Sequence, residues 1–414
     1  MTWDLHDYRL VTASAYPGMM APLTGHPSCV CVMSGDAAPG ALSLESLDGV
    51  RRRWRFGDVA RLADFVPKLL AETPPDERPL LLVPPRSSMA WEAAAAAWPG
   101  EVKLAGRPAV VTSRIAEDKI FVREQLAALG VPVPEAVVLP SAEIHFGLTG
   151  TRLGVPFVMQ SPNGAGGQGT HLILHEAGLL AALREQPHVE KWLLSRFAGS
   201  LTINAAGVVH ADGVQLLPIS VQSSGIAEVG ASFGSYCGSD FGAAQQLPYR
   251  VTAQALQHAA VVGEWLRGQG HLGLFGADIA VHGDEIAFLE VNPRIQGSSW
   301  LLSKLQRESG QDACLEEHVQ AILGAPLSTR TGPAAVGTGS HLIVRWTGPA
   351  GTIRHVPDGL EGVSGLPALG GTILPGAILA RLESPGSLST PDGHGLRPEA
   401  RFLLDRLRSD LEIS

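Results

Sequence analysis

Apolar runs alternate with helix-like stretches over the first hundred residues. Residues 28–35 (SCVCVMSG) and 79–85 (PLLLVPP) form short apolar runs that end at glycine or proline. Residues 58–71 have helical spacing interrupted at Pro67, and residues 87–98 predict a helix capped by serine. Strands that lead through short turns into helices predict an α/β domain.

Two amphipathic helices bracket the middle of the chain. The first begins near Lys119 and ends at Gly130, and its apolar face is expected to contain Ile120, Phe121, Leu126 and Leu129. The second covers residues 251–270 and ends at Gly268 or Gly270. From about 140 to 230 the pattern predicts only short strands and turns.

Residues 276–294 contain two runs of alternating apolar residues joined by His282, Gly283 and Asp284. We expect a hairpin symmetric about Asp284, with a three-residue loop and Gly283 in the left-handed conformation. Asp278 and Glu290 are each six residues from its centre, so they would lie opposite each other on one face. A two-residue Gly-Asp turn would place them on opposite faces.

A linker rich in Gly, Pro and Thr begins near residue 326 and precedes short strands and a final helix, 398–411. The fold class predicted from these patterns is α/β with an α+β core. The predicted domains are residues 1–110, 111–325 and 326–414, with a lid subdomain at about 135–196.

Charge and cysteine content narrow the functions available. The chain has 31 basic and 40 acidic residues and a formal net charge of −9, which argues against nucleic-acid and anionic-membrane partners. Four cysteines in 414 residues form neither a disulfide framework nor a zinc pattern, and Cys237 and Cys314 are interpreted as small apolar residues. The N-terminus lacks a signal-peptide pattern and no apolar run is long enough to span a bilayer, so a cytoplasmic location is expected.

Basic residues are distributed unevenly. Arginine predominates and only five lysines occur, which makes Lys119, in the first turn of a predicted helix, worth considering as a functional residue. Residues 51–55 (RRRWR) form a basic run. A solvated surface patch is the simpler interpretation of that run, and a ligand site is the alternative.

The glycine-rich loop Asn163–Thr170 (NGAGGQGT) lies between two apolar, strand-like runs. Glycines allow backbone N–H groups to converge on an anion. Because no helix follows the loop, the pattern predicts a strand–loop–strand lid over phosphates and differs from the dinucleotide motif. A flexible hairpin tip explains the loop equally well.

The two opposed acids predict a metal site. Opposed side chains lie about 4.5–5.5 Å apart, so two carboxylates repel unless a cation lies between them. Mg²⁺ is held by one or two carboxylates together with nucleotide phosphates. Asn292 adds an oxygen on the same face, and Arg294 places a guanidinium where a phosphate or carboxylate would bind. The alternative is a pair of surface acids on a solvated hairpin.

These motifs together resemble the ATP-grasp superfamily. The order is Glu-Asp-Lys at a helix start, the glycine loop between strands, Ser-Val-Gln at 220–222, Asp278, and FLEVNPRIQ. The layout is similar to the biotin carboxylase and carboxylate–amine ligase branches. The resemblance implies an ATP-grasp fold, with an N-terminal α/β domain, a two-lobed ATP-binding core and a small, mainly β C-terminal module.

The resemblance also implies roles for single residues. Nucleotide contacts are assigned to Lys119, Gln160, Asn163, Gly164, Gly166, Gly167, Gly169 and the hinge Ser195, Arg196 and Phe197. Mg²⁺, as two ions with Mn²⁺ as an alternative, is assigned to Asp278, Glu290 and Asn292. Arg294, Lys119 and Gln222 are the expected catalytic residues, with Arg294 stabilising an acyl phosphate and Gln222 near the reacting carboxylate.

Two departures from the family pattern bear on the chemistry. Gln160 stands where many members have a second phosphate-binding lysine. The basic stretch that follows Ser-x-Gln in biotin carboxylases is absent, which argues against bicarbonate and biotin chemistry. Residues 233–241 read instead as a loop shaped around an organic substrate or as a plain connector.

The expected activity is ATP-dependent ligation of a carboxylate to an amine through an acyl phosphate, with release of ADP and phosphate. Amino acids or short peptides are the expected substrates, and a homodimer remains open. Two alternatives are a regulatory nucleotide-binding protein without ligase activity and a kinase that stops at a phosphorylated product.

Overall fold

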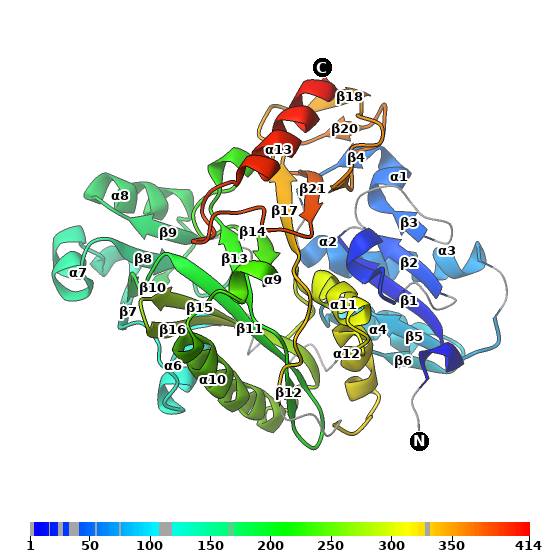
Figure 1. Cartoon of the computed structure of the whole chain (residues 1–414), viewed down its shortest axis with the longest axis horizontal. Helices are drawn as coiled ribbons and strands as arrows, with labels where there is room; N and C mark the ends of the chain where they lie inside the picture. The colour runs from blue at the N-terminus through cyan, green and yellow to red at the C-terminus, as the bar shows by residue number, and fades with distance from the viewer. Residues whose placement is uncertain are drawn as a thin grey trace.

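The computed structural model describes most of the chain, and four β-sheets organise the described part (Figure 1). The described residues are 4–15, 17–23, 28–32, 41–53, 56–73, 76–106, 118–164, 167, 169–327 and 332–414.

The N-terminal domain is built on a five-stranded parallel sheet. Its strands, in spatial order, are β3 (Ala41–Ser43), β2 (Ser28–Val32), β1 (Arg9–Ser14), β5 (Leu80–Val83) and β6 (Val102–Leu104). Its helices are α1 (Leu44–Asp48), α2 (Phe56–Arg61), α3 (Val66–Ala71) and α4 (Met89–Ala97). The strand order reverses between β1 and β5, and ligands of such sheets bind at the carboxyl ends of the strands at this switch point.

The lid is a four-stranded antiparallel sheet with two helices. Its strands, in order, are β7 (Ala136–Pro140), β10 (Lys191–Arg196), β8 (Phe157–Gln160) and β9 (Thr170–Ile173). The helices α7 (Phe146–Leu153) and α8 (Glu176–Glu185) contradict the prediction of only strands and turns in this region. Burial of Leu153, Leu179 and Ala182 in one core with Trp192 stabilises these helices.

A nine-stranded sheet forms the body of the protein. Its path is β16 (Glu285–Asn292), β15 (Gly273–His282), β11 (Leu201–Val209), β13 (Ser220–Ser224), β14 (Tyr236–Asp240), β17 (Ser340–Arg345), β21 (Ile378–Ser384) and β19 (Val363–Ser364), with β12 (Val214–Leu216) on β11. This sheet continues across the domain boundary suggested at residue 325, because β14 pairs with β17.

The strand β14 corrects the interpretation of residues 233–241 as a loop. Small residues allow the strand to lie inside the sheet: a Cβ on Gly238 would come within 1.9 Å of the His341 carbonyl oxygen. A run of Gly, Ser and Cys has no apolar period, so this strand could not be recognised from its pattern.

Helices cover both faces of the large sheet. Helix α10 (Tyr249–Gly268) packs on one face, where Ile203 and Phe275 point. Helices α11 (Ser299–Glu308) and α12 (Cys314–Ile322) pack on the other, where Val208 and Leu274 point. The cysteines Cys31, Cys237 and Cys314 are buried, as the interpretation of Cys237 and Cys314 as small apolar residues predicts for those two.

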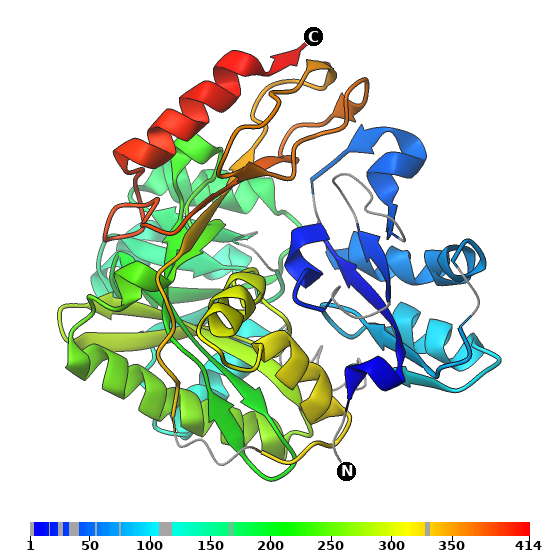
Figure 2. The same ribbon diagram turned by 45° about the vertical axis from the view of Figure 1, so that its right-hand side comes forward.

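The fourth sheet joins the two ends of the chain. Its order is β22 (Glu412–Ile413), β18 (Gly351–His355), β20 (Thr372–Ile373) and β4 (Val50–Arg51), and α13 (Pro398–Asp410) packs beside it (Figures 1 and 2). Strand β4 runs parallel to β20. The N-terminal domain therefore contributes a strand to the C-terminal part.

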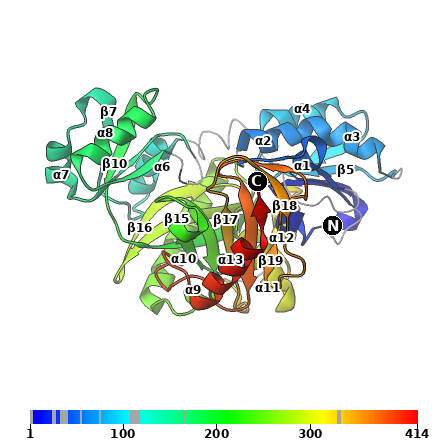
Figure 3. The same ribbon diagram turned by 90° about the horizontal axis from the view of Figure 1, so that it is seen from above.

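The remaining helices are α6 (Lys119–Ala128) and the short α9 (Phe241–Ala244). Single 3-10 turns occur at Leu5–Asp7, Pro17–Met20, Leu62–Phe65, Ser141–Glu143 and Ala227–Val229. The lid and the N-terminal domain lie at opposite ends of the molecule, on the same side of the large sheet (Figure 3). Among the described residues, no helix combines the length and the apolar character needed to cross a membrane.

Candidate active site

Asp278 on β15 and Glu290 on β16 lie directly opposite each other. The turn between the strands consists of two residues, Gly283 and Asp284, so the predicted three-residue loop is wrong. Gly283 has a φ of 60°, and a glycine with positive φ at the first of two turn positions is expected in a type II′ turn.

A β-bulge at Leu289 brings the two acids to one face. The two-residue turn sets a register in which Glu290 would pair with Ala277 and point away from Asp278. The register shifts by one residue beside Asp278, because Leu289 is an extra residue in β16. The predicted opposition of the carboxylates is confirmed, and its physical cause is the bulge.

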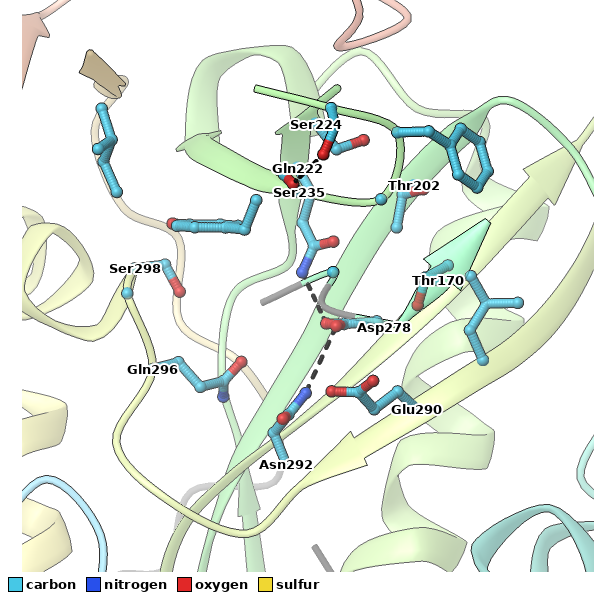
Figure 4. A pocket seen from close by; sticks show the side chains of 18 of the residues that line it. Thr170, Thr202, Gln222, Ser224, Ser235, Asp278, Glu290, Asn292, Gln296 and Ser298 are labelled. Carbon is cyan, nitrogen blue, oxygen red and sulfur yellow. Dashed lines mark hydrogen bonds between the residues drawn. The ribbon is translucent and has the colours of Figure 1, made fainter. Parts of the chain in front are cut away.

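Three side-chain amides surround the Asp278 carboxylate, and Figure 4 shows two of them, Gln222 and Asn292. Asn204 Nδ2 and Gln222 Nε2 donate to Oδ1 over 2.8 and 2.6 Å, and Asn292 Nδ2 lies 3.4 Å from Oδ2. Asn204 pairs with Asp278 across β11 and β15, and Gln222 comes from the next strand, β13. Three neighbouring strands thus hold one carboxylate in place.

The Asp278 carboxyl has a strongly perturbed acidity. Burial is the main cause and the negative charge of Glu290 adds to it; together they raise the pKa of Asp278 to about 6, against the hydrogen bonds from Asn204 and Gln222. Removing water from a carboxylate and placing a second one beside it both favour the protonated form. A cation bound here would relieve both effects.

Helix α6 points two cations toward this pair of acids. Its buried face consists of Lys119, Val122, Arg123 and Leu126, with the i, i+3, i+4, i+7 spacing of one helix face. The predicted apolar face is therefore wrong in part, since Leu129 is 41% exposed. The buried face of α6 contains both charged and apolar residues because it contacts polar groups of β16.

Lys119 and Arg123 each have a distinct contact. The Lys119 ammonium lies 3.5 Å from Glu290 Oε2 and donates to the Gly164 carbonyl oxygen over 2.6 Å. Arg123 Nη2 donates to the carbonyl oxygen of the bulged Leu289 over 3.1 Å. Burial lowers the pKa of Arg123 to about 10, and the charge of Glu290 opposes that shift.

The glycine-rich loop connects β8 and β9, as predicted. Gly167 and Gly169 have φ values of 82° and 73°, which only glycine adopts readily. A Cβ on Gly167 would lie 2.5 Å from the Gly234 carbonyl oxygen, so the loop packs closely on the connection before β14. Gly166 lies outside the described residues. At the start of the loop, the carbonyl oxygen of Asn163 accepts a hydrogen bond from Ser161 Oγ.

The other predicted nucleotide residues lie on the lid side of one cavity. Gln160, at the end of β8, donates weakly to Thr170 over 3.4 Å and lines the cavity. Ser195, Arg196 and Phe197, where β10 leads toward β11, also line it. The Arg196 guanidinium points instead to Glu135, at 2.7 Å.

Arg294 follows β16 and faces the same cavity. Its Nη2 donates to Asn292 Oδ1 over 2.8 Å, and Nη1 donates to the Ile295 carbonyl oxygen over 3.2 Å. Burial lowers the pKa of Arg294, opposed by the charges of Glu290 and Asp278. Because the Asn292 oxygen contacts Arg294, metal ligation by Asn292 requires its amide to turn.

The cavity has a volume of about 820 Å³ and reaches from the lid to the N-terminal domain. Lid residues Gln160 and Thr170 line one part, and Ala15 and Pro85, just after β1 and β5, line another. The topological switch point of the N-terminal sheet therefore opens into the cavity that contains Asp278.

The donor set suits a hard divalent cation. Asn204 and Gln222 occupy Oδ1 of Asp278, whereas Oδ2 has only the long contact from Asn292. No cluster of three or more His, Cys, Asp or Glu side chains that could hold a metal occurs in the described ranges. Mg²⁺ is commonly bound by one or two carboxylates, with nucleotide phosphates completing its coordination shell.

Sequence reasoning missed three residues of this site: Asn204, Arg123 and Gln296. Gln296 Oε1 accepts from Asn204 Nδ2 over 2.8 Å, and Gly276 makes room for it, because a Cβ there would lie 2.0 Å from Gln296 Nε2. The available signals were a lone asparagine in the apolar run 201–209 and an arginine one turn after Lys119.

Comparison with known proteins agrees with this geometry. Residues 116–298 match the model of the ATP-grasp domain. A formate-dependent phosphoribosylglycinamide formyltransferase from Burkholderia pseudomallei is 26% identical over 268 residues, which cover 61% of this chain and 61% of that protein. The match thus spans less than two thirds of this curated relative.

Solved structures share the fold over almost the whole chain. Biotin carboxylase from Campylobacter jejuni is 14% identical, with a TM-score of 0.66 and coverage of 99% of this chain and 92% of that one. L-amino acid ligase from Bacillus licheniformis is 16% identical, with a TM-score of 0.60 and 98% coverage of both chains. Residues 116–298 thus match an ATP-grasp domain, and the chain as a whole shares its fold with these two solved structures.

Proposed function

We propose that this protein is an ATP-dependent carboxylate–amine ligase that releases ADP and phosphate. The observation that carries the proposal is the pairing of Asp278 with Glu290 across the bulged hairpin, with Lys119 3.5 Å from Glu290. A purely structural hairpin would not need two opposed acids beside one cavity, with three amides on one acid and a buried lysine near the other.

Asp278 and Glu290 would hold Mg²⁺, with Asn292 as a further oxygen donor, and two ions are expected by family resemblance. Mn²⁺ would fit the same oxygen donors. When bound, the metal neutralises negative charge on the nucleotide phosphates and draws them to this end of the cavity. The lid residues Gln160 and Ser195–Phe197 line the part of the cavity left for the nucleoside.

In the proposed first step, an oxygen of the substrate carboxylate attacks the γ-phosphorus of ATP. The bond from that phosphorus to the β–γ bridging oxygen breaks, and ADP and an acyl phosphate form. The amine nitrogen then attacks the acyl carbon, the carbon–oxygen bond to phosphate breaks, and the nitrogen loses a proton as the amide forms.

The chain contributes position and charge to these steps. The guanidinium of Arg294 lies beside Asn292, where it can neutralise the phosphoryl oxygens and the acyl phosphate. Gln222, held on Asp278, borders the place of the substrate carboxylate. Gln160 donates a hydrogen bond without adding charge, so phosphate neutralisation relies on Lys119, Arg294 and the metal.

Exclusion of water is assigned to the glycine-rich loop. Its close packing of Gly167 on Gly234 brings the lid over the strands β13 and β14, next to the reacting centre. An acyl phosphate hydrolyses readily, so a covered site favours attack by the amine.

The substrates are a small carboxylic acid and a small amine, and amino acids or short peptides are our expectation. The names of the similar proteins point to different small molecules, formate in one and L-amino acids in another, which supports ligation without identifying the pair. A homodimer and a cytoplasmic location remain expectations from the sequence.

An ADP-release screen over amino acids and peptides with Mg·ATP, combined with detection of amide by mass spectrometry, tests the proposal. Glu290→Ala is expected to abolish turnover, whereas Glu285→Ala, on the exposed end of the same strand, is the matched control. Full activity in Glu290→Ala contradicts the assigned metal site. A phosphorylated acid without amide, whatever amine is added, identifies a kinase, and nucleotide binding without ADP release identifies a regulatory protein.

A further inference from the structure

The cavity has a second basic region, away from the metal carboxylates. Arg53, from the N-terminal basic run, and Arg345, at the end of β17, both line it. The carboxylates among its described lining residues are Asp278 and Glu290. Arg53 is exposed and Arg345 is half-buried, and both line a part of the cavity whose nearest acids belong to the metal site.

The three arginines at the start of the basic run have separate positions. Arg51 is buried and binds Glu45 at 2.8 Å, and its other N–H groups donate to carbonyl oxygens of the C-terminal part, among them Gly365 and Leu366. Arg52 forms a surface pair with Asp48. Arg53 has no hydrogen bond or ion pair within the described chain, and its side chain lies along Gly376.

Arg345 meets Arg53 from the C-terminal part. It pairs with Ile378 across β17 and β21, two residues beyond the Gly376 that Arg53 covers. Its Nη2 donates to the Tyr236 carbonyl oxygen over 2.7 Å, while Nη1 is buried without a partner among the described residues. Burial lowers the pKa of Arg345, Cys237 beside it opposes that shift, and the nearby charge of Arg53 adds to it.

The pair lies beyond the reacting centre. Gln222 reaches Asp278, and Ser224 is two residues further along the same face of β13, a step of about 7 Å. Ser224 and Ser235 lie on the side of Gln222 remote from Asp278 (Figure 4). Tyr236, whose carbonyl oxygen accepts from Arg345, pairs with Ser224. A carboxylate held at Arg345 would therefore lie at this end of β13, on the side of Gln222 remote from Asp278.

We propose that Arg53 and Arg345 bind a free carboxylate that does not react, carried by one of the two ligase substrates. The inference rests on the proposed function. An unpaired buried guanidinium N–H is costly, and a second positive charge beside it adds repulsion, so the site favours an anion. The carboxylate belongs either to a dicarboxylic donor or to an amino-acid or peptide acceptor.

Binding measurements that need no turnover test this subsite. Thermal-shift and calorimetric titrations at constant ionic strength, with Mg·ADP present, compare glutarate with its monoamide and glycylglycine with glycylglycinamide. We expect the wild type to bind the acid of at least one pair at least tenfold more tightly than its amide. Arg53→Gln is expected to lose this preference, Arg53→Lys to keep part of it, and Arg52→Gln to keep it in full.

Each of several results overturns the subsite. These are equal affinity for acid and amide in the wild type, an unchanged preference in Arg53→Gln, its loss in Arg52→Gln, or Arg53-dependent binding of inorganic phosphate alone. A preference for glutarate over its monoamide would assign the carboxylate to the acid substrate. A preference for glycylglycine over glycylglycinamide would assign it to the amine substrate. Failure of ligation is distinguishable: Arg53-dependent binding without ADP release, whatever acid and amine are supplied, would leave the subsite standing and refute the ligase.

Discussion

Arg123 donates a hydrogen bond of 3.1 Å to the carbonyl oxygen of Leu289, the residue whose insertion turns Glu290 toward Asp278. Because Leu289 is the extra residue of the bulge, it lies outside the regular β15–β16 pairing. The Arg123 guanidinium on α6 therefore provides a hydrogen-bond donor for the Leu289 carbonyl oxygen. A helix residue that need not touch substrate thus supports the register of the metal site.

Replacing Arg123 by Met is expected to weaken Mg·ATP binding. Loss of a hydrogen bond to a buried carbonyl costs about 1–3 kcal/mol, so the KM for Mg·ATP should rise roughly five- to 150-fold. Steady-state kinetics at varied Mg·ATP measure this, and Arg250→Met, at an exposed ion pair near the hairpin turn, is the control. An unchanged KM would show that the bulge holds without Arg123.

Asp278→Asn is expected to abolish ligation and to change how stability depends on pH. The folded state binds the Asp278 proton more tightly than the unfolded chain does, with a pKa of about 6 against 3.8. Without metal, the contribution of this group to the free energy of unfolding therefore falls as pH rises from about 4 to about 6. Urea unfolding in chelator should show the variant gaining on the wild type through this window. A constant difference between the two across it would contradict the raised pKa.

Gly167→Ala is expected to uncouple ATP consumption from amide formation. Its φ of 82° disfavours alanine, and the new Cβ would lie 2.5 Å from the Gly234 carbonyl oxygen, so the loop could not pack as observed. The ratio of ADP to amide should rise several-fold as water reaches the acyl phosphate. Gly154→Ala is a matched control in the lid, since its φ is 86° and no atom lies within 4 Å of its Cβ.

Arg51→Met is expected to destabilise the protein strongly, while Arg52→Met is not. The Arg51–Glu45 pair is almost fully buried, and removal of the guanidinium takes its charge away from a buried carboxylate, at a cost of about 3–5 kcal/mol. The adjacent Arg52–Asp48 pair is exposed and is worth about 1 kcal/mol or less. Urea unfolding measures both. The double variant Glu45→Gln/Arg51→Met should recover part of the loss, and equal effects of the two single changes would refute this explanation.

The helices predicted most accurately were those that begin or end at a capping residue or a glycine in their own sequence. Asp118 caps α6, Ser88 caps α4, and α10 ends at Gly268, close to the predicted positions. The strand β14 was missed because its stability comes from packing against distant segments and its residues have no apolar period. The lid helices α7 and α8 were missed although residues 179–185 of α8 are a run of helix-forming residues.

The sequence by itself determined the chemistry of the site: a lysine at a helix start, a glycine loop between strands, and acids in a hairpin that ends in Glu-Val-Asn-Pro-Arg. Only the tertiary structure decided how these groups meet. A two-residue turn alone would have separated Asp278 from Glu290, and the bulge that opposes them has a partner in Arg123, 166 residues away. Bulges and interdomain contacts such as Arg53 against Gly376 depend on surfaces that exist only after the chain has folded, so no local pattern records them.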